Sequence, residues 1–292
     1  MNGRWRSGFV AGLLALSAGA CAASPPTAIV TVARPCAGAA PRTTYGHVVV
    51  VFMENKAFGQ IIGNSAAPYL NGLARECGLA TAYHGVTYPS LPNYLAATSG
   101  STFGVRDDNL PAAHPLRVAS IFGQTGTSWQ ALSESMPSNC DKSNAYPYMV
   151  KHNPAAYFPP IAVACSKQNV PLPSAPTFAA KYTFVTPNMV HDMHDGTIAQ
   201  GDAWLKTFVP KVINSVGYQT GSTILVIVWD TDDRSANNRA PAIVVAPQVK
   251  PGTTSATAFN HYSLLRLSED TLGLPLLGNA RTAVSMRAAF HL

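Results

Sequence analysis

Long apolar runs alternate with mixed polar segments along this chain. Two of the runs, 48–53 and 224–229, consist entirely of Val, Ile, Leu, Phe, Met and Trp. A continuous run of this length is typical of a strand buried on both faces, as in a parallel sheet covered by helices. Shorter runs rich in β-branched and aromatic residues predict two further strands, at 182–185 and 242–245.

Segments with helical periodicity lie between these strands. We expect helices at 67–77, 92–98, 198–216 and 262–272. Strands that alternate with helices predict an α/β sandwich with a mostly parallel central sheet flanked by helices. The region 100–178 is rich in Pro, Asn and Ser, so we expect it to be a loop-rich insertion or cap.

Acidic residues stand at the ends of the two longest apolar runs, although only 12% of the chain is charged. The first run ends in Glu54-Asn55, and the second ends in Asp230, followed by Asp232 and Asp233. Functional groups of such sheets collect at the carboxyl ends of the strands. Carboxylates gathered there repel one another and lose hydration unless they bind a cation or share a proton. The leading interpretation is a metal-dependent hydrolytic site.

Further candidate residues follow the same pattern of strand ends and helix starts. Ser90 lies between two prolines at the start of a predicted helix, where it is either a nucleophile or simply a helix N-cap. The segment 191–195 supplies Asp192, His194 and Asp195 and is either a ligand cluster or a solvated loop. His261 opens the last predicted helix. We interpret His84 and His152 as structural histidines, and Tyr88 as a packing residue.

The N-terminus has the three-part pattern of an export signal over residues 1–23. Cys21 is a candidate for lipid attachment, although Ala18 stands where lipoprotein signals usually have a bulky aliphatic residue. Residues 24–43 read as a Pro/Ala/Thr-rich spacer, so the folded domain is expected over 44–292. No other segment is long and apolar enough to suggest a membrane anchor. The protein is therefore predicted to be secreted or held in the cell envelope.

Composition and net charge indicate a folded domain and argue against one class of partner. The chain has 292 residues, of which 47% are hydrophobic, which is enough for a substantial core. Removal of the predicted signal lowers the formal charge from +6 to +4, and no Lys/Arg cluster remains. A nucleic-acid partner is therefore not expected.

Four cysteines remain after the predicted signal, and an even number in an exported chain suggests disulfides. Three pairings are compatible with four cysteines, with four free thiols as the alternative. The simplest pairing by sequence joins Cys36 to Cys77 and Cys140 to Cys165.

The chain also resembles a known family in five ordered motifs. They are Val-Val-Val-Phe-Met-Glu-Asn, Pro-Ser-Leu-Pro-Asn-Tyr, Asn-Met-Val-His-Asp-Met-His-Asp-Gly-Thr-Ile-Ala-Gln-Gly-Asp-Ala-Trp-Leu, Val-Trp-Asp-Thr-Asp-Asp and His-Tyr-Ser-Leu-Leu-Arg. Together they resemble the bacterial phosphoesterase family, which holds secreted acid phosphatases and phospholipase C enzymes and belongs to the alkaline phosphatase superfamily. The similarity covers about residues 45–275 and is strongest to mycobacterial-type secreted acid phosphatases.

The resemblance implies roles for particular residues. Ser90 matches the nucleophile, and Glu54-Asn55 matches the acidic metal-binding pair of the first strand. Asp192, His194 and Asp195 match the central Asp/His segment. The remaining matches are the late histidine and the acidic residues after the second long strand, namely His261, Asp230, Asp232 and Asp233. Relatives commonly have His at Tyr88 and Glu at Thr231, and these two departures bear on metal affinity, pH optimum and metal dependence.

The expected function is that of a secreted phosphomonoesterase that acts through a phosphoseryl intermediate with one or more divalent metal ions. In this scheme Ser90, Asn55, His194 and His261 are catalytic. The residues expected to hold metal are Glu54, Asp192, Asp195, Asp230, Asp232, Asp233 and His261. The substrate would be a small-molecule or lipid-headgroup phosphate ester. The alternatives are a phospholipase C-type phosphodiesterase and an inactive envelope protein that binds phosphate or phospholipid.

Overall fold

The computed structural model describes residues 1–3 and 34–292. Almost all of the predicted signal peptide, including Cys21, and half of the predicted spacer lie outside the described residues. The compact unit Arg34–Leu292 holds all the elements described below. None of the helices in the described part of the chain has both the length and the apolar character needed to cross a bilayer.

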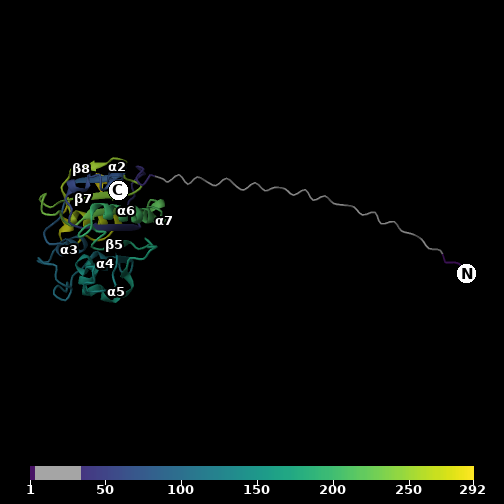
Figure 1. Cartoon of the computed structure of the whole chain (residues 1–292), viewed down its shortest axis with the longest axis horizontal. Helices are drawn as coiled ribbons and strands as arrows, with labels where there is room; N and C mark the ends of the chain where they lie inside the picture. Colours follow the sequence, from purple (N-terminus) through teal and green to yellow (C-terminus); the bar gives the residue numbers. More distant parts are fainter. Residues whose placement is uncertain (4–33) are drawn as a thin grey trace. The chain divides into compact units, whose positions relative to one another are not determined.

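Nine strands of the described residues form one sheet (Figure 1). Their order is β4-β3-β5-β1-β6-β7-β2-β8, and β9 also pairs with β2. Strand β7 runs antiparallel to β6 and β2, whereas the other paired neighbours are parallel, which confirms a mostly parallel sheet. The strands are β1 (His47–Met53), β2 (Gly78–His84), β3 (Trp129–Ser133), β4 (Asn169–Pro171), β5 (Tyr182–Thr186), β6 (Thr223–Trp229), β7 (Arg239–Val245), β8 (Thr254–Ser255) and β9 (Phe259–Asn260).

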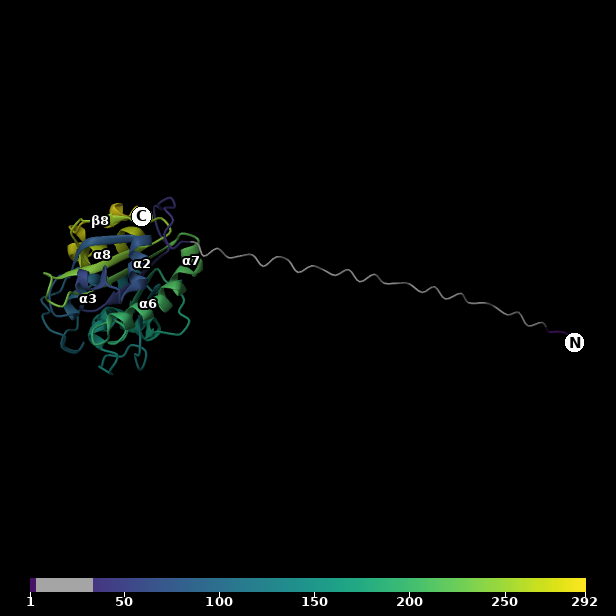
Figure 2. The ribbon, with the colours of Figure 1, turned by 45° about the horizontal axis from the view of Figure 1, so that its top comes forward.

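Helices cover the sheet, as expected for an α/β fold (Figure 2). Helix α2 packs against α6, and α3 packs against α8. All residues of β6 are buried, so both of its faces are covered. The α-helices are α1 (Phe58–Ile61), α2 (Pro68–Glu76), α3 (Leu91–Ser99), α4 (Ile121–Gln124), α5 (Ala162–Gln168), α6 (Ile198–Ile213), α7 (Val216–Gln219) and α8 (His261–Leu272). Short 3₁₀ turns are η1 (Val150–His152), η2 (Pro154–Tyr157), η3 (Pro159–Ile161), η4 (Gly278–Arg281) and η5 (Ala288–Phe290).

A buried carboxylate joins two of these helices. Asp202 of α6 accepts hydrogen bonds from the backbone N–H groups of Tyr69 (3.1 Å) and Leu70 (2.8 Å) at the start of α2. The first N–H groups of a helix have no partner within the helix, and the helix dipole favours a negative charge there. Asp202 therefore fixes the position of α6 against α2.

The region 100–178 takes part in the sheet instead of forming only a cap. Strand β3 pairs with β5, and β4 extends that edge by pairing with β3. Trp129 of β3 is fully buried and packs on Phe122 with ring centroids 5.0 Å apart. These strands were missed because both are short and stand among Pro, Asn and Ser residues, which dominate the local pattern.

Two disulfides confirm the predicted pairing. Cys36 is bonded to Cys77 and Cys140 to Cys165. Cys36 is buried, and the backbone of its neighbour Ala37 donates a hydrogen bond to the carbonyl of Pro247 (3.2 Å). The last part of the predicted spacer is therefore attached to the fold.

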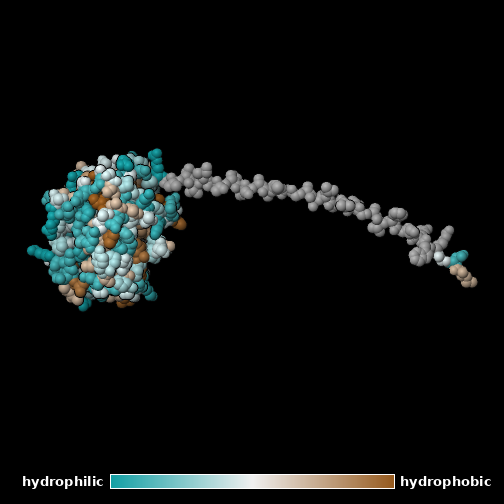
Figure 3. Space-filling model, viewed as in Figure 1, coloured by the Kyte–Doolittle hydropathy of each residue, from teal (hydrophilic) through white to brown (hydrophobic). Residues whose placement is uncertain are grey.

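The surface shown in Figure 3 is mixed, with small hydrophobic spots between hydrophilic residues. Exposed large apolar side chains are scattered through the sequence, for example Phe103, Tyr146 and Val216. Scattered exposed apolar residues are normal for a water-exposed surface.

We expect loss of the Cys36–Cys77 disulfide to destabilise the domain substantially. The bond closes a loop with a sequence separation of 41 residues. By loop-closure entropy, replacing both cysteines with serine should cost about 4 kcal/mol and lower Tm by roughly 10 °C, as measured by calorimetry. An unchanged Tm would show that the disulfide is not formed in the folded protein.

Stability should also depend on pH through Glu269 of α8. This side chain is buried, and burial raises its pKa to about 8. Because the folded state holds the proton more tightly, the stabilisation is full below the ordinary pKa of Glu and is lost as pH rises toward 8. Glu269→Gln should flatten the fall in Tm between pH 5 and pH 8, whereas Glu76→Gln, at an exposed position, should leave it unchanged. The same slope in both variants would contradict this assignment.

Candidate active site

The carboxyl ends of β1 and β6 bring two acidic residues together. These strands are parallel neighbours, and Met53 pairs with Trp229 at their ends. Glu54 and Asp230 are therefore adjacent, and both are fully buried. The backbone N–H of Asn55 donates to Asp230 Oδ1 (3.2 Å). Asn55 has φ of 46°, a left-handed conformation that Asn tolerates better than most residues.

Ser90 lies directly before α3 and points into this acidic site. Its Oγ donates a hydrogen bond to Glu54 Oε2 (2.9 Å), and the residue is only 4% exposed. The side chain makes no capping hydrogen bond to the helix. Of the two readings of Ser90, the structure thus favours a site residue over a simple N-cap.

Glu54 is held from several sides. Besides Ser90, the hydroxyl of Tyr94 donates to Glu54 Oε1. Tyr94 is four positions after Ser90 in sequence, one helical turn along α3. Burial, and then the charges of Asp230 and Asp192, raise the pKa of Glu54 well above its usual value. Binding of a proton or a cation would therefore reduce the repulsion among these buried carboxylates.

His152 lies between two buried carboxylates. Its Nε2 is 3.2 Å from Glu54 Oε1, and its Nδ1 is 3.2 Å from Asp192 Oδ2. The ring stacks on Tyr94 with centroids 5.2 Å apart. Neither carboxylate contact is aligned as a hydrogen bond, so His152 Nε2 and Asp192 Oδ2 remain unsatisfied within the described residues. Burial, with Lys151 nearby, lowers the pKa of His152 well below its usual range.

Asp192 supports the opposite side of this cluster. Its backbone carbonyl accepts from the N–H of Glu54 (2.8 Å), and its Oδ1 accepts from the N–H of His194 (2.7 Å). Burial raises the pKa of Asp192 to about 7. The predicted segment 191–195 therefore reaches the strand-end cluster through Asp192 and His194.

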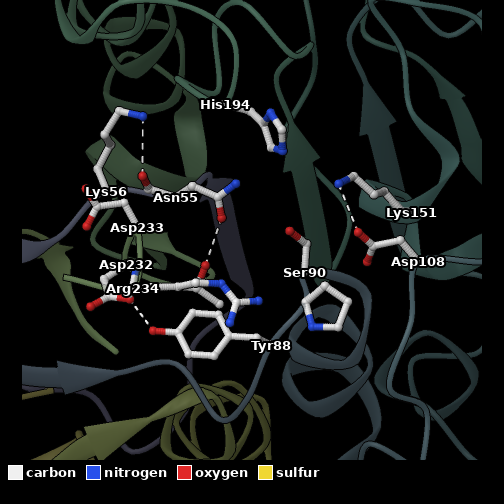
Figure 4. Close-up of a pocket in the computed structure, with 12 residues that line it drawn as sticks. Asn55, Lys56, Tyr88, Ser90, Asp108, Lys151, His194, Asp232, Asp233 and Arg234 are labelled. Carbon is white, nitrogen blue, oxygen red and sulfur yellow. Dashed lines mark hydrogen bonds and ion pairs between the residues drawn. The ribbon is translucent and has the colours of Figure 1, made fainter. Parts of the chain in front are cut away.

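A pocket of about 370 Å³ opens above Ser90 (Figure 4). His194 lines it, and His194 Nδ1 lies 2.7 Å from Asp195 Oδ1. Lys151 is paired with Asp108 (3.1 Å). The complete lining is Asn55, Lys56, Tyr88, Pro89, Ser90, Asp108, Lys151, His194, Thr231, Asp232, Asp233 and Arg234.

The side chains of three further candidate residues are engaged in structural hydrogen bonds. His261 is buried at the start of α8, where Nε2 lies 2.6 Å from the backbone carbonyl of Asp230 and Nδ1 lies 2.8 Å from the hydroxyl of Tyr83. Asp232 accepts hydrogen bonds from backbone N–H groups of its own loop and from the Tyr88 hydroxyl. Asp233 is exposed and accepts from Gln60 Nε2 (2.7 Å).

The donor set around Ser90 suits a hard divalent cation. Asp230 Oδ2 is buried and has no hydrogen-bond partner among the described residues. Carboxylate, amide and hydroxyl oxygens come together there from Glu54, Asn55 and Ser90, and such oxygens are the ligands that Mg²⁺ and Ca²⁺ prefer. Within residues 34–292, however, no three His, Cys, Asp or Glu side chains are arranged to hold one ion. A cation here would therefore also need the amide or hydroxyl oxygens.

Sequence reasoning missed several residues of the buried cluster and of the pocket. His152 was interpreted as structural, and Tyr94 was not singled out as a site residue, although its helical spacing from Ser90 was a usable signal. The cations Lys56, Lys151 and Arg234 carry no local pattern, because each reaches the pocket from a different loop or turn.

Thr231, one of the two departures from the family pattern, contacts the site directly. Its Oγ1 donates to Asn55 Oδ1 (2.8 Å) and lies 3.3 Å from Asp230 Oδ1. Asn55 Oδ1 keeps a second lone pair for a ligand, and the amide NH₂ can donate to one as well.

Solved structures share this fold. A protein of the alkaline phosphatase superfamily from Vibrio parahaemolyticus aligns with TM-score 0.58 and 14% identity, over 86% of this chain and 74% of that one. A lipoteichoic acid synthase from Listeria monocytogenes aligns with TM-score 0.56 and 11% identity, over 80% of this chain and 73% of that one. At such low identity the likeness shows the fold alone, which is that of the alkaline phosphatase superfamily.

Sequence relatives are more specific. A phosphatidylinositol-3-phosphatase from Mycobacterium tuberculosis is 35% identical over 82% of this chain and 81% of its own length. A phosphate-repressible acid phosphatase from Penicillium chrysogenum is 29% identical over 72% of this chain, which spans about half of that protein, 55%. The model of the Phosphoesterase family matches residues 64–275. On this match and the mycobacterial similarity, the chain belongs to the Phosphoesterase family, as the five motifs predicted.

Proposed function

We propose that this protein is an exported phosphomonoesterase in which Ser90 forms a phosphoseryl intermediate. Family membership and the acid phosphatase relatives make it a hydrolase of phosphoric esters. The observation that carries the finer proposal is the buried hydrogen bond from Ser90 Oγ to Glu54 (2.9 Å) at the floor of a pocket. The phosphatidylinositol-3-phosphatase relative supports a monoester on a small molecule or lipid headgroup as substrate. Two disulfides support export, since such bonds persist in oxidising compartments.

In the first step Ser90 Oγ attacks phosphorus. The new Oγ–P bond forms as the bond from phosphorus to the leaving oxygen breaks, and the hydroxyl proton moves to Glu54 Oε2. Asn55 donates from its amide to a phosphoryl oxygen. His194 gives a proton to the leaving oxygen from Nε2, because Nδ1 is engaged by Asp195.

In the second step water releases phosphate. His194, now neutral, takes a proton from the water as it attacks phosphorus. The Oγ–P bond breaks, and Ser90 recovers its proton from Glu54. Tyr94 keeps Glu54 oriented through both steps, and the His152 ring stacks on Tyr94.

A divalent cation held by Glu54 and Asp230, with oxygens of Asn55 and Ser90, would lower the pKa of the Ser90 hydroxyl and offset negative charge on the phosphoryl group. The buried Asp230 Oδ2, which has no hydrogen-bond partner within residues 34–292, supports a cation at this position. His261 would then act behind the site, by fixing the Asp230 backbone.

Replacement of Ser90 tests the proposal. Ser90→Ala should lower kcat for an aryl phosphomonoester at least about a thousandfold with the fold intact, because it removes the hydroxyl that is bonded to Glu54 and forms the covalent intermediate. Acid quenching of the unaltered protein should trap phosphate on Ser90, as read by mass spectrometry. Ser101→Ala, outside the pocket, is the matched control. Turnover that survives Ser90→Ala would refute the assignment of Ser90 as nucleophile. Faster hydrolysis of the matching diester would favour a phosphodiesterase. Binding of phosphate without turnover would favour the inactive binding protein.

Removal of metal tests the cation separately. Exhaustive chelation should lower turnover at least about tenfold, and an added divalent ion should restore it. Asp230→Asn should raise the ion concentration needed for half-maximal recovery, because it removes one charged ligand, whereas Asp141→Asn on the surface should not. Full activity of protein shown to be metal-free by elemental analysis would contradict a metal-assisted mechanism.

A further inference from the structure

Arg234 stands out among the cations of the pocket. Lys151 is neutralised by Asp108 (3.1 Å), and Lys56 Nζ donates to the backbone carbonyls of Met193 (2.7 Å) and Asn55 (3.3 Å). Within residues 34–292, by contrast, no carboxylate lies at ion-pair distance from the Arg234 guanidinium. A pocket arginine without an anionic partner is suited to bind an anion from solution.

The guanidinium is placed by stacking. It lies over the Tyr88 ring, 4.4 Å from the ring centroid. The Tyr88 hydroxyl is held by Asp232, so the ring has a fixed position. In Figure 4, Arg234 and Tyr88 lie side by side at the opening that also contains Ser90. Such stacking contributes about 0.5–1 kcal/mol at an exposed site and orients the donors of the guanidinium.

The backbone under Arg234 is also specialised. Its φ is 70°, a left-handed conformation that is unfavourable for a residue with a long side chain. Asp232 stabilises this turn, because its Oδ1 accepts from the N–H of Arg234 (2.7 Å) and its Oδ2 accepts from the N–H groups of Ala236 (2.6 Å) and Asn238 (3.0 Å). The carboxylate of Asp232 is thereby used to hold the loop. Asp233 beside it is directed to Gln60.

Depth separates Arg234 from the reacting group. Ser90 is buried, with 4% exposure, whereas Arg234 is exposed at the rim of the same pocket. A phosphoryl group attacked by Ser90 would therefore lie near the floor. The leaving group of the substrate, which extends outward from the ester oxygen, would then contact the rim and Arg234.

We propose that Arg234, held on Tyr88, binds a second anionic group on the leaving-group side, so that preferred substrates are phosphomonoesters whose alcohol or phenol carries a carboxylate or a further phosphate. This inference rests on the proposed phosphomonoesterase activity. It gives Tyr88 a specific role as the platform for the arginine.

A matched pair of substrates tests the inference. 4-Carboxyphenyl phosphate carries an anion on the leaving group, and 4-carbamoylphenyl phosphate is its neutral counterpart. Comparing each variant with the unaltered protein on both esters cancels their different chemical reactivities. Arg234→Gln should lower kcat/KM about fivefold on the carboxylate and leave the amide within twofold, which is the size expected of one exposed charge pair.

Tyr88 variants separate stacking from hydrogen bonding. Tyr88→Phe keeps the ring and should preserve the carboxylate-to-amide ratio, whereas Tyr88→Leu should lower that ratio as Arg234→Gln does. Arg239→Gln is the matched control, because Arg239 lies over the Phe58 ring (4.1 Å) outside the pocket and should not change the ratio. Added salt should reduce the carboxylate preference of the unaltered protein and have no effect on the ratio in Arg234→Gln.

Two outcomes would overturn the inference while leaving the proposed function intact. Equal losses on both esters in Arg234→Gln would place Arg234 at the transferring phosphoryl group. An unchanged ratio would mean that it binds no part of the substrate. Failure of the unaltered protein to hydrolyse either ester, with or without divalent metal, would instead overturn the proposed function itself.

Discussion

The pairing of β1 with β6 is the constraint on which the site depends. Their parallel register places Glu54 beside Asp230 at one edge of a fully buried pair of strands. Neither residue can move away from the other without breaking the central hydrogen-bond ladder. The fold thus keeps two carboxylates close together in a medium that raises their pKa values.

Neighbouring side chains and backbone groups stabilise these two carboxylates by hydrogen bonds. The Ser90 and Tyr94 hydroxyls donate to Glu54, and Asn55 and Thr231 surround Asp230. Buried charge of this kind is costly unless it is paired or ligated. The same contacts that make the carboxylates tolerable also aim Ser90 at the opening of the pocket, so stability and chemistry are coupled in one small region.

Features encoded locally could be predicted from the sequence. The apolar runs that became β1 and β6 identified the central strands, and the acidic residues at their ends were visible without any tertiary information. Strand β2 was missed because its Gly- and Ala-containing sequence has a weak strand pattern. Strands β3 and β4 were missed because they are short and lie in a region rich in turn residues.

The candidate site shows the same division. Glu54 was singled out from its place at a strand end, whereas the local pattern left Ser90 open between a helix N-cap and a nucleophile, and only the family resemblance pointed to the second. His152 was not predictable, since it ends a 3₁₀ turn, and only the packing against Tyr94 brings it between two carboxylates. Asp232 and His261 lie close to the site, but each stabilises backbone there. Asp232 accepts hydrogen bonds from its own loop, and His261 contacts the backbone carbonyl of Asp230 at the end of β6.

The long central motif, which ends just after Asp202, combines two separate structural requirements. Its first part supplies His194 to the pocket and Asp192 to the buried cluster beneath it, whereas Asp202 near its end holds the start of α2. Trp204, two positions further along α6, donates to Glu134 (3.1 Å). A descendant that lost its nucleophile would therefore still be under selection to keep the second half of the motif, because the packing of its helices would depend on it as before.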